Sequence, residues 1–172
     1  IENFDIYADQ LKQRLDPSVT IMQGINSQIK KKQKRIVFAD GEDQNTLKAA
    51  IAFKKSGLGI PILVAKEKVV KERLKEIGYS ENFDIEIVNS ESKEKREKYS
   101  KYIFKKLHRD KGELEPDVYE LYLRDCDKII RNDSVVWGSC MVSCGDADAM
   151  VTGNTRRYGQ SLDRVLKVVD SR

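Results

Sequence analysis

The chain has 172 residues, of which 40% are hydrophobic and 35% are charged, enough for one domain with a hydrophobic core beneath a charged surface. A mean hydropathy of -0.58 and the lack of a long apolar run exclude a membrane span. The net charge of +4 and the pI near 8.8 are too mild to indicate a nucleic-acid binder. Three cysteines, an odd number, and the lack of a signal peptide predict a reducing, cytoplasmic location. Because the chain opens with Ile1, we expect it to be a piece of a longer protein.

The N-terminal part of the chain predicts two helices ahead of the first strand. Apolar residues recur at helical spacing over residues 3–15 and 19–31, and Pro17 is placed to open the second helix. The lysines and the arginine at residues 30–35 suit an anion patch, but a solvated helix end is the favoured interpretation. We therefore expect an appended helical arm over residues 1–33.

Strands and helices then alternate. The sequence predicts strands at residues 35–39, 60–65 and 85–88, with helices at 46–55 and 68–77 between them. This alternation is typical of a parallel sheet covered by helices on both faces. Ligands of such sheets bind beyond the carboxyl ends of the strands. The loops at residues 40–43, 89–92 and 153–157 are therefore expected to share one rim.

The second half of the chain predicts mainly helices. They are expected at residues 93–111, 117–130 and 135–142, the last of them capped by Asp133 or Ser134 and ended by Gly145. A short buried strand is predicted at residues 147–152 and another helix from near Arg156. The final segment, 161–169, is interpreted as a helix or as a helix followed by a strand.

The turn after the last predicted strand is the strongest candidate for a binding site. Gly153 follows the strand, and Asn154 and Thr155 are placed to cap the next helix. Backbone amides at a helix N-terminus favour an anion, and Arg156 and Arg157 add charge and bidentate donors. The alternative is a tight turn with two solvated arginines.

For three carboxylates and a lone histidine, a structural role is favoured over metal binding or catalysis. Asp40, Glu42 and Asp43 suit a metal or acid–base pair, but carboxylates at a helix start more often cap the helix. His108 is the lone histidine, on a charged helix, and is expected at the surface. No Gly-x-Gly-x-x-Gly or Walker spacing occurs.

The cysteines favour a structural role too. Cys140 and Cys144 would share a helical face, and with Cys126 they are expected to be buried small apolar side chains rather than zinc ligands or nucleophiles. We therefore predict no metal site and no catalytic residue in this chain.

Several segments resemble a known family. Residues 145–156, Gly-Asp-Ala-Asp-Ala-Met-Val-Thr-Gly-Asn-Thr-Arg, are similar to phosphotransacetylases and above all to the phosphotransacetylase-like domain at the C-terminus of bacterial NADP-dependent malic enzymes. Residues 7–17, 35–43 and 124–126 resemble the same domain. The resemblance implies an α/β fold with three αβα layers, of the phosphotransacetylase or isocitrate-dehydrogenase-like kind. Residues 34–172 would form its first half, and residues 1–33 a linker arm.

The resemblance also implies what is missing. In phosphotransacetylases the serine, arginine and aspartate of the acyl-transfer site lie in the later half of the domain. Two arginines of their phosphate site are replaced here by His108 and Asp163, with Arg109 and Arg164 next to them. A carboxylate in place of such an arginine repels a phosphate.

The function that the resemblance implies is regulation and assembly. The domain would bind acetyl-CoA or a related phosphorylated metabolite through Gly153, Asn154, Thr155 and Arg156, with Arg157 and Arg109 as weaker candidates. The parent enzyme would convert malate to pyruvate with NAD(P) and a divalent Mg or Mn ion held outside this chain, and would be a homo-oligomer.

Two alternatives stay open. One is an active phosphate acetyltransferase, which transfers acetyl between coenzyme A and phosphate. The other is a pure oligomerisation scaffold. A nucleic-acid role ranks last.

Overall fold

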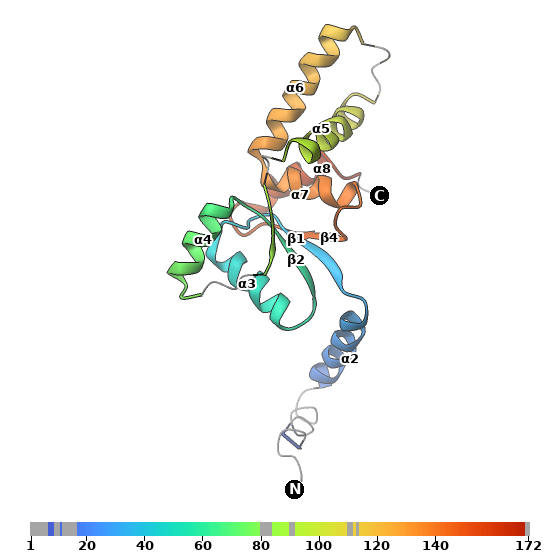
Figure 1. The fold of residues 1–172 in the computed structure, drawn as a ribbon. Helices are drawn as coiled ribbons and strands as arrows, with labels where there is room; N and C mark the ends of the chain where they lie inside the picture. The colour runs from blue at the N-terminus through green and yellow to red at the C-terminus, as the bar shows by residue number, and fades with distance from the viewer. Residues whose placement is uncertain are drawn as a thin grey trace.

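The computed structural model describes residues 17–79, 84–89, 92–109 and 114–170, together with the single positions 7, 8, 11 and 112. The first predicted helix, residues 3–15, lies almost wholly outside the described residues. The N-terminal helix that is described, α2, lies away from the sheet and its covering helices (Figure 1).

The centre of the fold is a parallel sheet with the strand order β3-β2-β1-β4. β1 (Lys34–Phe38) pairs with β2 (Gly59–Val64) and β4 (Ala149–Val151), and β2 pairs with β3 (Glu86–Val88). All three pairings are parallel, as the alternation of predicted strands and helices requires. Each predicted strand is therefore confirmed within one or two residues at its ends. The prediction that the last strand is buried is wrong, because β4 lies at the edge of the described sheet and exposes Ala149 and Val151.

The described helices follow the predicted order. They are α2 (Pro17–Lys31), α3 (Gln44–Lys55), α4 (Glu67–Glu76), α5 (Lys93–Leu107), α6 (Pro116–Asn132), α7 (Ser134–Ser143) and α8 (Tyr158–Leu166). The last segment of the chain is helix α8 followed by a turn, so the alternative of a final strand is wrong for the described residues. α5 and α6 form a helical pair that projects beyond the sheet (Figure 1).

Alternate residues of the central strands feed two separate cores. Val37 and Ile62, both fully buried, face α5, α6 and α7 in one core cluster. Their neighbours Phe38 and Leu63 face α3 and α4 in the other. This period of two is the natural consequence of a strand that is covered on both faces. The predicted three-layer αβα architecture is confirmed.

Gly138 lets α7 lie close against the sheet, and Gly145 ends the helix. A Cβ on Gly138 would lie 2.6 Å from Sδ of Met150 and 3.1 Å from Cγ1 of Val37. Gly145 has a φ of 77°, and the amide that follows it donates to the carbonyl of Met141 at 2.8 Å. This is the predicted glycine C-cap, and it directs the chain into β4.

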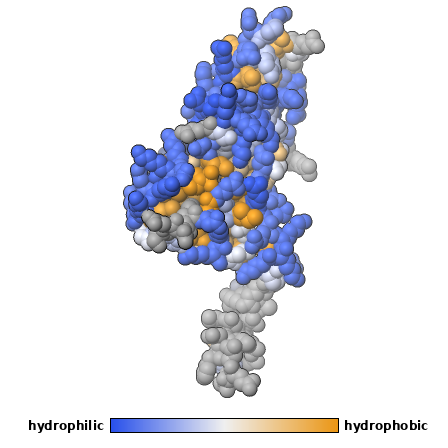
Figure 2. Space-filling model, viewed as in Figure 1, coloured by the Kyte–Doolittle hydropathy of each residue, from blue (hydrophilic) through white to orange (hydrophobic). Residues whose placement is uncertain are grey.

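The largely hydrophilic surface is consistent with the high proportion of charged residues in the sequence. Figure 2 shows a largely hydrophilic face with a hydrophobic area near the middle of the molecule. None of the helices that the structure describes combines the length and the apolarity needed to cross a membrane.

Candidate functional site

The carboxyl ends of the strands surround a cavity of about 290 Å³. Loops after β1, β2 and β4 contribute to its wall, and α6 and α7 contribute where they meet. Its lining includes Asp40, Gly41, Glu42, Asp43, Lys66, Asn89, Arg131, Ser134, Trp137, Thr155 and Arg156. The predicted loops at residues 40–43, 89–92 and 153–157 each contribute described residues to this lining, so the prediction that they share one rim is confirmed. We call this space the rim cavity.

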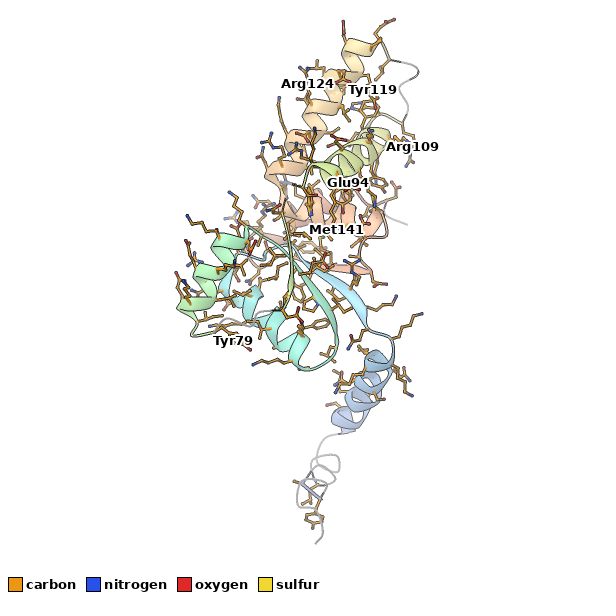
Figure 3. All side chains as sticks on the ribbon, in the orientation of Figure 1. Tyr79, Glu94, Arg109, Tyr119, Arg124 and Met141 are labelled. Atoms are coloured by element: carbon orange, nitrogen blue, oxygen red, sulfur yellow. The ribbon has the colours of Figure 1, made fainter. Side chains whose placement is uncertain are left out.

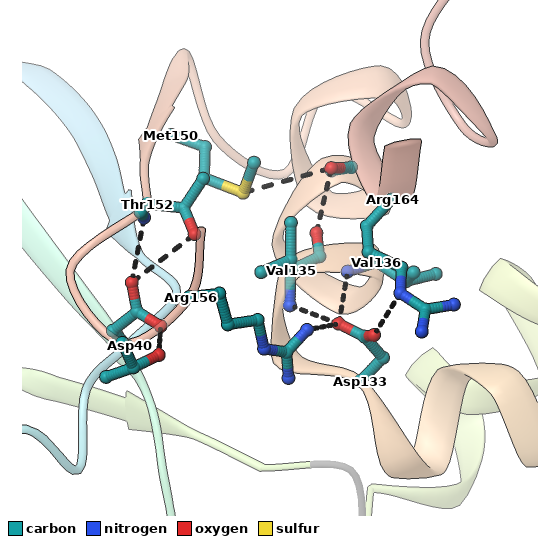
Figure 4. Close-up of polar contacts among 11 residues, drawn as sticks. Asp40, Asp133, Val135, Val136, Met150, Thr152, Arg156 and Arg164 are labelled. Atoms are coloured by element: carbon teal, nitrogen blue, oxygen red, sulfur yellow. Dashed lines mark hydrogen bonds and ion pairs between the residues drawn. The ribbon is translucent and has the colours of Figure 1, made fainter. Parts of the chain in front are cut away.

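Asp40 holds the turn that follows β4. Its carboxylate is buried, and it accepts hydrogen bonds from the backbone amides of Gly153 at 3.0 Å and Asn154 at 3.2 Å. The hydroxyls of Thr152 and Thr155 donate to it as well (Figure 4). The sequence predicted that an external anion would accept hydrogen bonds from these donors. In the structure, the Asp40 carboxylate accepts them instead.

The capping role predicted for this turn is wrong. α8 begins at Tyr158, and its N-cap residue is Arg157, without a side-chain cap hydrogen bond. The side chain of Asn154 instead donates to Asp43 and to the hydroxyl of Thr46. The turn is thus tied back to the start of α3 rather than to the helix that follows it.

Arg156 contacts a buried carboxylate at the start of α7. Asp133 caps α7 by accepting from the amides of Val135 and Val136, and it pairs with Nη1 of Arg156 at 2.8 Å and with Nε of Arg164 at 3.1 Å (Figure 4). Arg156 therefore lies between the rim cavity and a second cavity of about 880 Å³. The second cavity is lined by Leu107, Asn132, Asp133, Arg156, Gln160, Asp163, Arg164, Leu166 and Lys167.

The two weaker candidates lie apart from these cavities. Arg157 is exposed, and Arg109 lies just after α5 (Figure 3), where it pairs with Asp170 at 3.5 Å. Neither side chain lines the rim cavity or the second cavity. Of the six candidate residues, the structure brings together the four from Gly153 to Arg156, and only Thr155 and Arg156 line the rim cavity.

His108 is not the surface residue that its helix suggested. It is half-buried, with its ring stacked on Tyr122 at a centroid distance of 4.4 Å and 5.0 Å from the ring of Phe104. α6 supplies Tyr122, which the sequence of α5 does not reveal. Asp163 and Arg164 both line the second cavity. An arginine is therefore present there, one residue after the position at which phosphotransacetylases are expected to have theirs.

The acidic cluster has the structural roles that were favoured. Asp43 caps α3, Asp40 holds the turn after β4, and Glu42 accepts from the backbone amide of Lys66 at 3.1 Å. Within the described part of the chain, no group of three or more histidine, cysteine or carboxylate side chains is arranged to hold a metal ion.

The cysteines are largely buried, as predicted. Cys126 and Cys140 are buried and Cys144 is half-buried, all three as free thiols. Burial raises the pKa of Cys126 to about 11 and also raises the pKa values of Cys140 and Cys144. A thiol with a raised pKa is a poor nucleophile at neutral pH, which supports the packing role.

Replacing Asp43 with alanine is expected to lower the free energy of unfolding by about 1 kcal/mol at pH 7. The backbone amide of Thr46, which donates to the Asp43 carboxylate at 2.9 Å, holds the pKa of that carboxyl below its usual range. A lowered folded-state pKa means that the stabilisation is complete above the unfolded value of about 3.9 and is lost as the pH falls through the folded value. Urea unfolding at pH 7 and at about pH 3 measures the difference.

The matched control is Asp43→Asn, which keeps an acceptor oxygen at the cap without a titrating charge. It should retain most of the stability, and its own stability should depend less on pH near the unfolded pKa. An Asp43→Ala deficit of equal size at both pH values would contradict the titration of this cap.

Several residues of the rim cavity were not predicted from the sequence. Lys66 lies two residues after the end of β2 and could have been found by the rule that ligands bind at carboxyl strand ends. Arg131 and Trp137 come from the α6–α7 junction, and no local motif marks them. Asp133 was predicted as one of two alternative caps, but its two arginine partners were not foreseen.

Comparison with known proteins agrees with this geometry. The family model described as phosphate acetyl/butaryl transferase matches residues 20–172. A probable NADP-dependent malic enzyme of Rickettsia prowazekii is 35% identical over 169 residues, which cover 97% of this chain and 21% of the relative. An NADP-dependent malic enzyme of Rhizobium meliloti is 34% identical over 99% of this chain and 21% of its own length. The chain thus spans about a fifth of the length of these relatives.

A solved structure shows the same architecture. A phosphotransacetylase from Streptococcus pyogenes superposes with a TM-score of 0.73 at 25% identity, over 87% of this chain and 42% of its own. A phosphate acetyltransferase of Clostridium acetobutylicum is 29% identical over 81% of this chain and 39% of its own length. The parallel sheet, its two helical layers and the matched residues lead to one conclusion: this chain belongs to the phosphate acetyl/butaryl transferase family.

Proposed function

We propose that this chain is the phosphotransacetylase-like regulatory domain of an NADP-dependent malic enzyme and that it senses acetyl-CoA. The observation that carries the proposal is Arg156, whose guanidinium lies between two cavities at the ligand-binding rim of the fold. Similarity to malic enzymes over nearly the whole chain supports the parent enzyme. The parent would oxidatively decarboxylate malate to pyruvate and carbon dioxide, with NADP as the oxidant and a divalent metal held outside this chain.

Regulation by such a domain requires that the effector bind one state of the enzyme more tightly than another. The two arginines on Asp133 suit this requirement, because they connect the turn after β4 and α8 to the N-terminus of α7 through one buried carboxylate. An anion that attracts Arg156 would weaken its pairing with Asp133. That change would alter the contact between α7 and the turn after β4.

Replacing Arg156 with methionine is expected to raise the acetyl-CoA concentration for half-maximal response at least tenfold. A hydrogen bond to a charged group contributes about 1.5–3 kcal/mol, and about 1.4 kcal/mol is a factor of ten. Malic enzyme activity of the full-length protein, measured across an acetyl-CoA titration, tests this. Because Arg156 also pairs with Asp133, urea unfolding of the variant is measured alongside.

The control is Arg124→Met on the exposed side of α6 (Figure 3), a residue outside both cavities. It should leave both the basal rate and the response unchanged. A response to acetyl-CoA that is identical in wild type, Arg124→Met and Arg156→Met would remove Arg156 from the site. No response in any of them would refute the sensor.

A phosphate acetyltransferase is the second candidate, supported by the likeness to a solved phosphotransacetylase. It predicts release of phosphate from acetyl phosphate in the presence of coenzyme A. We expect no such turnover from this chain, because His108 is enclosed by aromatic rings and Asp163 places a carboxylate in the second cavity.

Self-association is part of the same proposal. β3 and β4 are the edge strands of the described sheet, and α8 exposes Tyr158, Leu162 and Leu166. Open edges and exposed apolar side chains favour association with another copy. Light scattering that gives the mass of a single chain at all concentrations would argue against it.

A further inference from the structure

The N-terminal helix α2 exposes an apolar stripe. Ile21, Met22 and Ile25 are 65%, 54% and 43% exposed, and Ile29 on the same face is half-buried. The helix lies apart from the sheet (Figure 1), and neither core cluster of the described residues includes any of its side chains. A surface helix normally turns such a stripe toward the core of its own domain. The core of this chain therefore does not account for the stripe of α2.

α2 also has little stability of its own. It has 15 residues, and even alanine-rich helices become marginal in water below about 12–15 residues. Gly24 lies in its middle, where a Cβ would meet nothing within 4 Å. A glycine in a helix interior lowers helix stability relative to alanine, and no close contact of the described chain requires one here. Packing against a partner would supply the stability that α2 lacks.

The spacing of the stripe makes it complementary to itself. Ile21 and Ile29 lie four residues before and four residues after Ile25, so all three share one helical face. If two α2 helices pack antiparallel around a twofold axis at Ile25, the two Ile25 side chains meet each other. Each Ile21 then meets Ile29 of the other copy. A twofold interface requires such a self-complementary patch.

Charge favours the antiparallel arrangement over the parallel one. α2 carries no charge before its last turn, where Lys30 and Lys31 lie, and Lys32 follows. A parallel pair would place these lysines of both copies side by side, where they repel. In the antiparallel pair, a rise of about 1.5 Å per residue separates them by about 15–21 Å along the axis. This separation exceeds the Debye length of about 8 Å at physiological ionic strength.

We infer that α2 pairs antiparallel with α2 of a second copy of this chain, with Ile25 at the twofold axis. The inference rests on the self-association in the proposed function and deepens it, because it names the surface and its geometry. It does not depend on acetyl-CoA. Two short helices bury less than the roughly 800 Å² per partner that is typical of stable complexes, so we expect a dimer that dissociates on dilution.

Cysteine crosslinking tests the arrangement of the two helices. Ile25→Cys is expected to give a covalent dimer with diamide, which takes up the two protons and two electrons that two thiols release as they form a disulfide. Ile21→Cys is not, because its two copies lie about 12 Å apart along the axis, whereas a disulfide joins Cα atoms about 4.4–6.8 Å apart. A mixture of Ile21→Cys and Ile29→Cys should crosslink. Wild type, with its three native cysteines, is the control.

The crosslinks also decide between the two orientations. If Ile21→Cys crosslinks with itself as efficiently as Ile25→Cys does, the helices are parallel and the inference is overturned. If neither variant crosslinks beyond wild type, α2 does not pair with itself, and another partner covers the stripe.

Ile25→Glu is expected to raise the dissociation constant of the dimer at least tenfold, because it places two like charges in contact at the axis. The matched control is Ser27→Glu, which adds the same charge at an exposed position on the opposite face of α2, and it should associate like wild type. Analytical ultracentrifugation over a range of concentrations measures the association, and circular dichroism checks that the variants are folded. Equal dissociation constants for wild type and Ile25→Glu would overturn the inference.

These outcomes are separate from those that test the proposed function. If wild type and Ile25→Glu dimerise equally, the self-association stands and the pairing of α2 does not. If Ile25→Cys crosslinks but acetyl-CoA never changes the malic enzyme activity of the full-length protein, the pairing stands and the sensor does not.

Discussion

Replacing Trp137 with alanine is expected to lower the free energy of unfolding by about 3–5 kcal/mol. The side chain is fully buried in the core between the sheet and α5 to α7, and its ring meets the ring of Tyr99 edge-on at a centroid distance of 5.0 Å. Its removal loses this contact and leaves a cavity that the surrounding helices fill only in part. Because the variant lacks tryptophan, urea unfolding is followed by far-UV circular dichroism.

Leu121→Ala is the control, since Leu121 on α6 is 57% exposed and surface substitutions usually change stability by less than about 0.5 kcal/mol. Trp137→Phe should lie between the two, because it keeps most of the ring volume. A Trp137→Ala variant that unfolds at the same urea concentration as Leu121→Ala would contradict the packing of α7 on the sheet.

Replacing Asp40 with alanine is the second large effect, a loss of about 2–4 kcal/mol. The substitution removes the acceptor of the Gly153 and Asn154 amides and of two threonine hydroxyls at a buried position. Donors left without a partner carry a desolvation penalty that a simple loss of contact does not. Urea unfolding measures the change, and hydrogen exchange at Gly153 and Asn154 should accelerate beyond the global effect.

Asp84→Ala is the matched control for a lost aspartate. Asp84 pairs with Lys54 at 2.8 Å, but its side chain is completely exposed, so the variant should unfold like wild type. An Asp40→Ala variant with the stability of Asp84→Ala and with unchanged exchange at Gly153 would show that Asp40 does not hold the turn.

Most of the fold could be predicted because its signals are local. Strands such as Arg35 to Ala39 have apolar β-branched runs, helices have apolar residues at 3.6-residue spacing, and Gly145 marks a helix end that no other residue type suits as well. Their alternation then restricts the topology to a parallel sheet with covered faces, which the structure has. The resemblance of residues 145–156 to phosphotransacetylases pointed to the same family.

The location of the candidate site could be predicted from the sequence, but the hydrogen-bond partners within it could not. The strand ends predicted that the loops after β1, β3 and β4 share a rim, because parallel strands end on the same side. They did not reveal that the Asp40 carboxylate would occupy the amides of Gly153 and Asn154, which are more than 100 positions later in the chain. The sequence pattern shows that donors exist, whereas only packing decides which acceptor reaches them.

The sequence by itself determined the α/β class, the order of the described elements and the family, since each of these depends on short-range periodicity or on local motifs. Tertiary structure alone decided the partners of the charged and polar side chains. It brought Arg156 and Arg164 to Asp133, enclosed His108 between rings of α5 and α6, and buried Trp137 Nε1 without a hydrogen-bond partner among the residues that the structure describes. Contacts between residues far apart in the chain depend on how the layers pack, and no local pattern encodes that arrangement.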